Sequence, residues 1–231
     1  MISSAEAAAY LRWTEGDELS SRFVSSKTRF IGNIIRFIIP KRFKIIARRR
    51  YLLSKALASE IDKHNADIVL DLGAGYNTLG ERWSDRHSTK RFIEVDVEPI
   101  IKRKTSSLPS KKSLVLVAGD ITKPAIYVSL GKRIRGASTI ILLEGVSSYL
   151  NREEIDVCLA GIENILRDGG GVLITHQTTS AKEGQTLRSI FWGKPTETDV
   201  VAVLRHRGWV VNTKPSGGWT LVIGKFPRST K

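Results

Sequence analysis

An apolar run at residues 67–72 opens directly into the turn Gly73-Ala74-Gly75. Glycines remove the side chains that would keep a ligand away from the backbone, so this turn is suited to close approach by a bound molecule. The six-residue pattern Gly-x-Gly-x-x-Gly is not completed, because Asn77 and Thr78 come after the turn. The significance of the turn therefore depends on which residues stand at the ends of the later apolar runs.

Acidic residues stand at the ends of three later apolar runs: Asp96 closes residues 90–96, Asp120 closes 113–120 and Glu144 closes 139–144. Taken singly, each acid is better explained as a loop residue or a helix N-cap. Because the carboxyl ends of parallel strands meet at one edge of a sheet, all three together favour a nucleoside-binding crevice. Asp96 is placed to accept two ribose hydroxyls there.

The chain after residue 66 alternates apolar runs with segments long enough for crossover helices. The runs lie at 67–72, 91–96, 114–118, 139–143 and 171–175. This alternation predicts an α/β fold with a parallel sheet covered on both faces. Two last runs, 209–212 and 219–223, are separated by too few residues for a crossover helix, so they must pair antiparallel.

The first 62 residues predict helices and no strand. Ser3 and Glu6 have the spacing of a capping box ahead of a short helix. Apolar side chains then recur at helical spacing from Phe30 to Ile39, where Pro40 interrupts, and again from Leu52 to Ile61. We expect residues 1–62 to form a basic helical cap that folds over the crevice, and residues 63–231 to form the core.

Positive charge is concentrated in this cap. The chain has 37 Lys and Arg against 23 Asp and Glu, a net charge of +14, and no acid occurs between Leu19 and Ser59. That stretch holds Arg22, Lys27, Arg29, Arg36, Lys41, Arg42, Lys44, Arg48, Arg49, Arg50 and Lys55. Such a field attracts a carboxylate substrate, an acidic peptide, nucleic acid or an anionic membrane surface; a merely solubilising face is the alternative.

Length and composition limit the class of protein. A chain of 231 residues with 41% hydrophobic content predicts one core with an appended cap. Cys158 is the single cysteine, so an intramolecular disulfide is excluded and a cytoplasmic location is expected. The first ten residues do not read as a signal peptide, and residues 30–40 are too short for a transmembrane segment. No His, Asp and Glu cluster has metal-ligand spacing.

The motifs together resemble the leucine carboxyl methyltransferase family of S-adenosylmethionine-dependent enzymes, over roughly residues 45 to 226. The resemblance rests on the glycine turn with Tyr76-Asn77-Thr78, on residues 92–99 with Lys102 or Lys104 behind them, and on 144–150, 191–195 and 204–209. It implies a Rossmann-like sheet of seven strands in the order 3-2-1-4-5-7-6, with strand 7 antiparallel.

The resemblance also implies which residues hold the methyl donor, S-adenosylmethionine, and its product, S-adenosylhomocysteine. Gly73, Ala74 and Gly75 would lie under the methionine portion, Asp96 would take the ribose, Asp120 and Ile121 the adenine, and Glu144 with Gly145 the sulfonium end. An arginine ahead of the first strand would bind the donor carboxylate. Arg48, Arg49 and Arg50 compete for this role, and a helical register that buries Leu52, Leu53 and Ala56 favours Arg49.

An acceptor carboxylate is already ionised at neutral pH, so its methylation needs a group that orients it rather than a strong base. Tyr149, with Lys27 or Arg29, is the candidate for that task. His176 would serve instead as a base for a hydroxyl or amine acceptor, although a histidine there is more often structural. Residues 177–192, which would roof the acceptor pocket, are small and polar.

The leading hypothesis is therefore an O-methyltransferase acting on a carboxylate of a small acid or a peptide. An N- or hydroxyl-directed small-molecule methyltransferase is the second hypothesis. An RNA-binding methyltransferase or RNA-binding module is the third, suggested by the charge of +14. It is disfavoured because the basic stretch lacks aromatic stacking platforms of recognisable type, and because Glu144-Gly-Val-Ser stands where a base-methylation motif would follow the fourth strand. The sequence does not indicate an oligomeric state.

Overall fold

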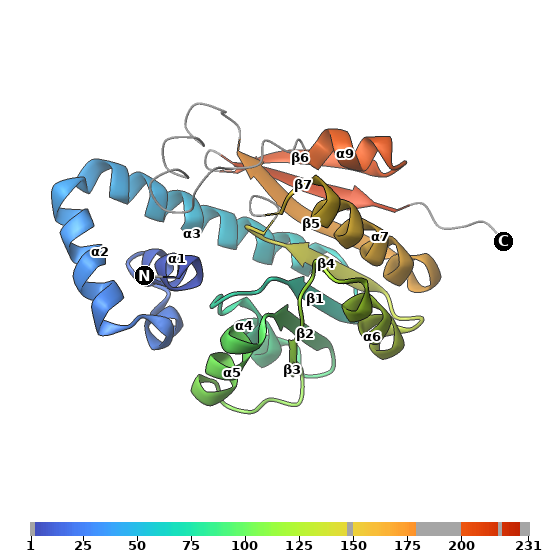
Figure 1. Cartoon of the computed structure of the whole chain (residues 1–231), viewed down its shortest axis with the longest axis horizontal. Helices are drawn as coiled ribbons and strands as arrows, with labels where there is room; N and C mark the ends of the chain where they lie inside the picture. Colours follow the sequence, from blue (N-terminus) through green and yellow to red (C-terminus); the bar gives the residue numbers. More distant parts are fainter. Residues whose placement is uncertain (1–2, 147–149, 179–199, 217–218, 227–231) are drawn as a thin grey trace.

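The computed structural model describes residues 3–146, 150–178, 200–216 and 219–226 (Figure 1). The helices are α1 (Ser4–Trp13), the 3-10 helix η1 (Glu18–Phe23), α2 (Ser26–Ile38), α3 (Pro40–Lys63), α4 (Leu79–Arg86), α5 (Glu98–Ser107), α6 (Pro124–Ile134), α7 (Arg152–Gly169) and α9 (Val200–His206). The strands are β1 (Ile68–Leu72), β2 (Arg91–Asp96), β3 (Leu114–Ala118), β4 (Thr139–Leu143), β5 (Gly171–Thr178), β6 (Val210–Ser216) and β7 (Trp219–Lys225).

The strands form one sheet of seven in the order β3-β2-β1-β4-β5-β7-β6. β1 to β5 pair in parallel, and β7 pairs antiparallel with both β5 and β6. This confirms the predicted order and the antiparallel last hairpin. β5, β6 and β7 each extend beyond the predicted apolar runs, because the ladder continues through polar residues such as Gln177 and Thr213.

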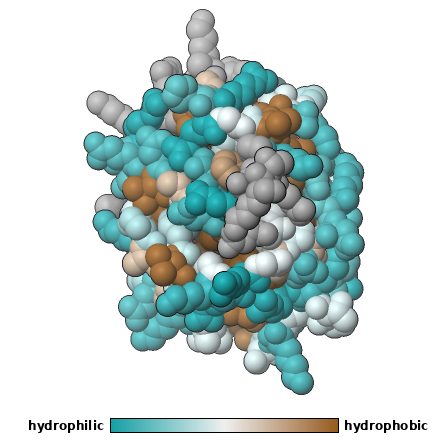
Figure 2. Space-filling model, turned by 90° about the vertical axis from the view of Figure 1, so that its right-hand side faces the viewer, coloured by the Kyte–Doolittle hydropathy of each residue, from teal (hydrophilic) through white to brown (hydrophobic). Residues whose placement is uncertain are grey.

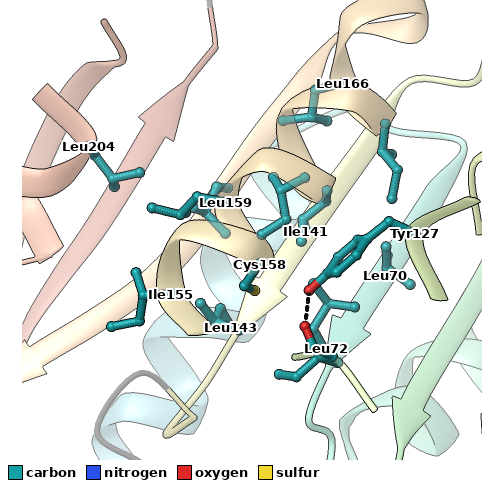
Figure 3. Packing of buried hydrophobic residues seen from close by; sticks show 14 of the residues in the cluster. Leu70, Leu72, Tyr127, Ile141, Leu143, Ile155, Cys158, Leu159, Leu166 and Leu204 are labelled. Carbon is teal, nitrogen blue, oxygen red and sulfur yellow. Dashed lines mark hydrogen bonds between the residues drawn. The ribbon is translucent and has the colours of Figure 1, made fainter. Parts of the chain in front are cut away.

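Helices cover both faces of the sheet. On one face α6, α7 and α9 pack against inward side chains of β1, β4 and β5, and Figure 3 shows Cys158, Leu159 and Leu166 of α7 beside Ile141 and Leu143 of β4. On the other face α3 and α4 pack against β1, β2 and β4. The carboxyl ends of the parallel strands are left for the connecting loops, which is where a ligand site is expected in this architecture.

The N-terminal helices, which we call the cap, pack around a separate small core. Ser3 caps α1 by accepting a hydrogen bond from the Glu6 N–H at 3.1 Å, and Pro40 ends α2 and begins α3. α1, η1 and the start of α3 pack together with the loop after β1, where Phe23 stacks on Tyr76 with ring centroids 5.0 Å apart. α3 then continues onto the sheet, so it joins the cap to the core.

Within the described ranges, no helix combines the length and the apolar character that crossing a membrane requires. α2 and the beginning of α3 nevertheless expose several large apolar side chains, and Figure 1 shows α2 at the left edge of the molecule.

Candidate functional site

A cavity of about 380 Å³ lies at the carboxyl ends of the parallel strands, within the size range of small-molecule sites. The loops after β1, β2, β3 and β4 form its floor and walls, and α1 and α3 contribute the remaining side. The three acids Asp96, Asp120 and Glu144, predicted to share one crevice, all line it. The cavity also brings together Gly73, Ala74, Gly75, Ile121 and Gly145.

The glycine turn is held in a shape that other residues rarely adopt. Gly73 has φ 73° and Gly75 has φ 54°, both in the left-handed region. The Gly73 N–H donates to the Val95 carbonyl at 2.8 Å, which fixes the turn against β2. A Cβ on Gly73 would lie 2.2 Å from Cγ2 of Val146 in the loop after β4, so this position accommodates no side chain without movement.

Asp96 lies at the end of β2 and faces the cavity with a half-buried carboxylate. Its Oδ2 accepts the Gly75 N–H at 2.7 Å and its Oδ1 accepts the Val97 N–H at 2.7 Å. Partial burial raises the pKa of this carboxyl above its usual value despite the two backbone donors. Each carboxylate oxygen has a second lone pair, so Asp96 can still accept the two hydroxyls of a ribose.

Asp120 shapes the loop after β3. Its Oδ1 accepts the N–H of Thr122 at 2.9 Å and the hydroxyl of Thr122 at 2.7 Å, and these bonds lower the pKa of the exposed carboxyl. The loop places the buried side chain of Ile121 against the cavity, and the Ile121 carbonyl accepts the Tyr127 hydroxyl at 2.7 Å (Figure 3). This wall is suited to a flat apolar group with polar edges.

One buried guanidinium group, that of Arg12, and one partly buried group, that of Arg50, lie close to Glu144. Arg50 Nη1 lies 3.2 Å from Glu144 Oε1, and Arg12 is buried beside the same carboxylate. Burial alone would raise the pKa of Glu144, but Arg50, Arg12 and His176 keep it below the usual value. Burial lowers the pKa of Arg12 to about 10, and Glu144 opposes that shift. Two cations against one anion suit this end of the cavity to an anionic group.

The structure places Arg50, rather than Arg49, among the residues that line the cavity. The buried residues of α3 include Phe43, Ala47, Leu53, Leu57 and Ile61, and Arg50 falls in the same series at spacings of three and four. The sequence-based preference for Arg49 assumed that Leu52 and Ala56 are buried, but both are only partly buried. The buried stripe is therefore rotated by about a quarter of a turn toward Arg50.

Arg12 was missed by sequence reasoning, which assigned no ligand to α1. Ser4, Ala8 and Arg12 recur at intervals of four residues, and Ala5 lies beside them, so one face of α1 lines the cavity. Small residues on that face let the helix approach the loops closely. A single arginine after a run of alanines is the sequence signal that could have identified it.

The candidate acceptor groups are not all at the cavity. Lys27 and Arg29 lie on the exposed side of α2 and do not line it; the Arg29 guanidinium rests 4.6 Å from the ring centroid of Trp13. His176 is buried on β5, edge-on to Trp219 with ring centroids 4.7 Å apart, and is close enough to Glu144 to affect its pKa. Tyr149 and residues 179–192 of the expected roof lie outside the described residues.

A buried polar network supports the glycine turn from below. Lys104 of α5 is completely buried, forms an ion pair with Glu94 of β2 and donates to the Asn77 carbonyl at 2.9 Å. Asn77 donates from Nδ2 to Asp71 Oδ2 at 2.7 Å. Burial, and then the negative charge of Glu94 on the adjacent strand, raise the pKa of Asp71 to about 8. This network fixes the turn on which the cavity depends.

Comparisons with known proteins agree with this arrangement. The family model described as leucine carboxyl methyltransferase matches residues 17–163. A comparison with curated proteins gives no significant match. Among solved structures, a putative methyltransferase from Thermobifida fusca is similar with a TM-score of 0.68 and 16% identity, covering 96% of this chain and 94% of that one.

Two further structures share the fold. An O-methyltransferase family protein from Burkholderia thailandensis has a TM-score of 0.62 at 15% identity, covering 96% of this chain and 71% of that one. Human N-acetylserotonin methyltransferase, solved in complex with S-adenosylmethionine, has a TM-score of 0.59 at 14% identity, covering 95% of this chain and 66% of that one. At these identities the likeness shows the fold alone.

Proposed function

Because the chain belongs to the leucine carboxyl methyltransferase family, we propose that it transfers a methyl group to a carboxylate of a small acid or a peptide. It is a methyltransferase that uses S-adenosylmethionine, and its sheet has the strand order of that class. The finer assignment, the carboxylate acceptor, is our proposal. The observation that carries it is the position of Arg12 and Arg50 beside Glu144, which sets two guanidinium groups against one carboxylate at this end of the cavity.

The residues of the cavity fit the donor by their chemistry. Asp96 offers free lone pairs for two hydroxyls, the loop of Asp120 and Ile121 offers an apolar wall for a base, and the turn at Gly73 and Gly75 lets a ligand approach the backbone. The guanidinium of Arg50 would bind the donor carboxylate, which leaves Arg12 for a second anionic group. The donor supplies an activated methyl group on a positively charged sulfur.

The chain's own contribution is orientation and exclusion of water. Methyl transfer is an in-line displacement, and fixing both reactants in a closed site provides much of the rate enhancement. An ionised carboxylate already carries the attacking electron pair, so no side chain has to remove a proton from it. Arg12 is suited to orient such an acceptor because its buried guanidinium faces the cavity from the side of α1. Tyr149 remains a candidate for the same task.

The test uses the chain with methyl-labelled S-adenosylmethionine and a fractionated cell extract, and then treats the product with mild base. Carboxyl methyl esters release volatile labelled methanol, whereas N-methyl and ether products do not. We expect base-labile label that depends on the protein and is absent with the Gly73→Val variant, which cannot keep the turn open. Label that is incorporated but resists base would contradict a carboxylate acceptor and leave the methyltransferase assignment intact.

One observation favours a second candidate, a hydroxyl or amine acceptor. His176 is buried near enough to Glu144 to lower the pKa of that carboxyl, and a neutral imidazole can act as a base. Base-resistant label, together with its loss in a His176→Gln variant that still binds the donor, would support this candidate.

A further inference from the structure

The outward face of α2 is apolar, although an outer helix on a globular protein normally turns polar side chains to solvent. Phe30 is 67% exposed, Phe37 87%, Ile38 68% and Ile34 41%. These positions recur at spacings of three and four along Ser26–Ile38 and so form one stripe. Ile45, 50% exposed, adds a further apolar side chain near the start of α3.

The inward face of α2 carries the small residues instead. Thr28 and Gly32 are buried, and a Cβ on Gly32 would lie 2.4 Å from the ring of Tyr10 in α1. Tyr10 also donates from its hydroxyl to Asn33 Oδ1 at 2.7 Å. This close packing fixes the rotation of the helix, so Phe30 and Phe37 cannot turn inward without breaking these contacts.

Basic residues border the apolar stripe. Arg29 and Arg36 lie on one flank of α2, and exposed Lys41, Arg42 and Lys44 come next at the corner where α3 begins. No acidic residue occurs anywhere between Leu19 and Ser59. By contrast, on the face of the molecule shown in Figure 2 the hydrophobic residues form small separate patches among hydrophilic ones.

We propose that α2 and the start of α3 bind an anionic membrane surface, with α2 lying in the plane of the interface. Its phenylalanine and isoleucine side chains would enter the boundary between headgroups and acyl chains, while the flanking lysines and arginines contact anionic headgroups. A short helix with a bulky apolar face and cationic flanks has the properties of an interfacial helix. Phe30 and Phe37 could stack on bases, but they lie about two helical turns apart. Ile34 and Ile38, which complete the stripe, give no stacking surface, so a membrane fits the stripe better than nucleic acid.

The proposal is independent of the methyl acceptor, because α2 contributes no residue to the lining of the cavity. The test measures co-sedimentation of the full chain with vesicles of phosphatidylcholine alone, or of phosphatidylglycerol and phosphatidylcholine at roughly 1:2. We expect at least about tenfold stronger partitioning to the anionic vesicles, and a steep decrease as salt rises from about 0.1 to 0.5 M.

Paired variants separate the stripe from general surface properties. The double variant Phe30→Ser with Phe37→Ser should lower partitioning to anionic vesicles by about tenfold or more. The control double variant, Val128→Ser with Val210→Ser, removes two apolar side chains elsewhere on the surface that are 62% and 61% exposed, and should leave partitioning unchanged. The double variant Arg36→Gln with Arg42→Gln should weaken vesicle binding. The control double variant, Lys132→Gln with Arg135→Gln, removes the same two charges on α6 and just after it, and should weaken binding less. Circular dichroism verifies that each variant is folded.

Several outcomes would overturn the proposal. Absence of binding to anionic vesicles, equal binding to neutral ones, or equal losses in the test and control pairs would each do so. A native dimer that Phe30→Ser with Phe37→Ser converts to a monomer would identify the stripe as an interface between two copies. A large fall in Tm in that double variant would show that another part of the chain covers the two rings.

Discussion

Arg50 Nη1 lies 3.2 Å from Glu144 Oε1, which connects the middle of α3 to the loop after β4 across 94 positions of sequence. The contact links the cap to the carboxyl edge of the sheet at the cavity. Because both side chains are largely buried, the pair is screened little by salt. The ion pair therefore joins the cap to the cavity that we propose as the donor site.

The first prediction concerns this arginine. Arg50→Gln should lower the affinity for S-adenosylmethionine by about tenfold or more, because a charge-assisted bond to the donor carboxylate is lost. Isothermal titration calorimetry measures the change. Arg49→Gln is the matched control, since it removes the same charge one residue away and lies outside the cavity lining. A larger loss in Arg49→Gln would instead support the choice made from sequence.

The second prediction concerns Asp96. Asp96→Ala should weaken binding of both S-adenosylmethionine and S-adenosylhomocysteine by about 1–3 kcal/mol, because hydrogen bonds to the ribose are lost and the Gly75 N–H loses its acceptor. Glu98→Ala removes an exposed acid two residues away and should change neither affinity. Equal affinities for native protein and Asp96→Ala would place the ribose elsewhere.

The third prediction separates backbone strain from lost space at the glycine turn. Gly73 and Gly136 have φ of 73° and 76°, so Ala at either position costs about 1 kcal/mol in the left-handed region. A Cβ on Gly136 meets nothing within 4 Å, whereas one on Gly73 meets Val146 at 2.2 Å. Gly73→Ala should therefore lower both Tm and donor affinity, while Gly136→Ala should lower Tm slightly and leave affinity intact. Similar behaviour of the two variants would contradict a specific role for the turn.

Much of this fold could be predicted because its signals are local. Apolar runs, glycine turns and strand-end acids lie within a few residues of one another, and the rules of parallel sheets then bring Asp96, Asp120 and Glu144 to one edge. Whether Arg12 and Arg50 point into the cavity depends on the rotation of two cap helices about their own axes. The spacing of apolar residues in the sequence determines that rotation only to within about one residue. The apolar periodicity of α2 was recognised, but its outward direction is set by Gly32 against Tyr10, a contact between separate helices.

The buried ion pair below the turn gives the fourth prediction. Lys104→Met leaves Glu94 buried without its cation and should reduce the free energy of unfolding by about 3–5 kcal/mol. Lys102→Met, on the exposed side of the same helix, should change it by less than about 0.5 kcal/mol. Urea unfolding measures both. Adding Glu94→Gln to Lys104→Met should restore part of the loss; a further additive loss would mean that the two residues are not coupled.

The last prediction concerns pH. The pKa of Asp71 is about 8 in the folded chain against an ordinary value of 3.8, because burial and the charge of Glu94 favour its neutral form. Between these values the folded protein binds a proton that the unfolded chain lacks. The stability contributed by that proton is fully present below about pH 4 and is lost as pH rises through about 8, with a slope of at most about 1.4 kcal/mol per pH unit.

Asp71→Asn keeps the shape of the side chain and an oxygen that accepts Asn77 Nδ2, but cannot ionise. Unfolding free energies of native protein and variant, measured by urea titration from pH 5 to pH 8, should therefore diverge, with the native protein losing more stability as pH rises. Subtracting the two profiles removes the contribution of other groups, including Glu144, whose lowered pKa acts at acid pH. Parallel profiles over this range would show that Asp71 is ionised in the folded state, and that Lys104 neutralises it together with Glu94.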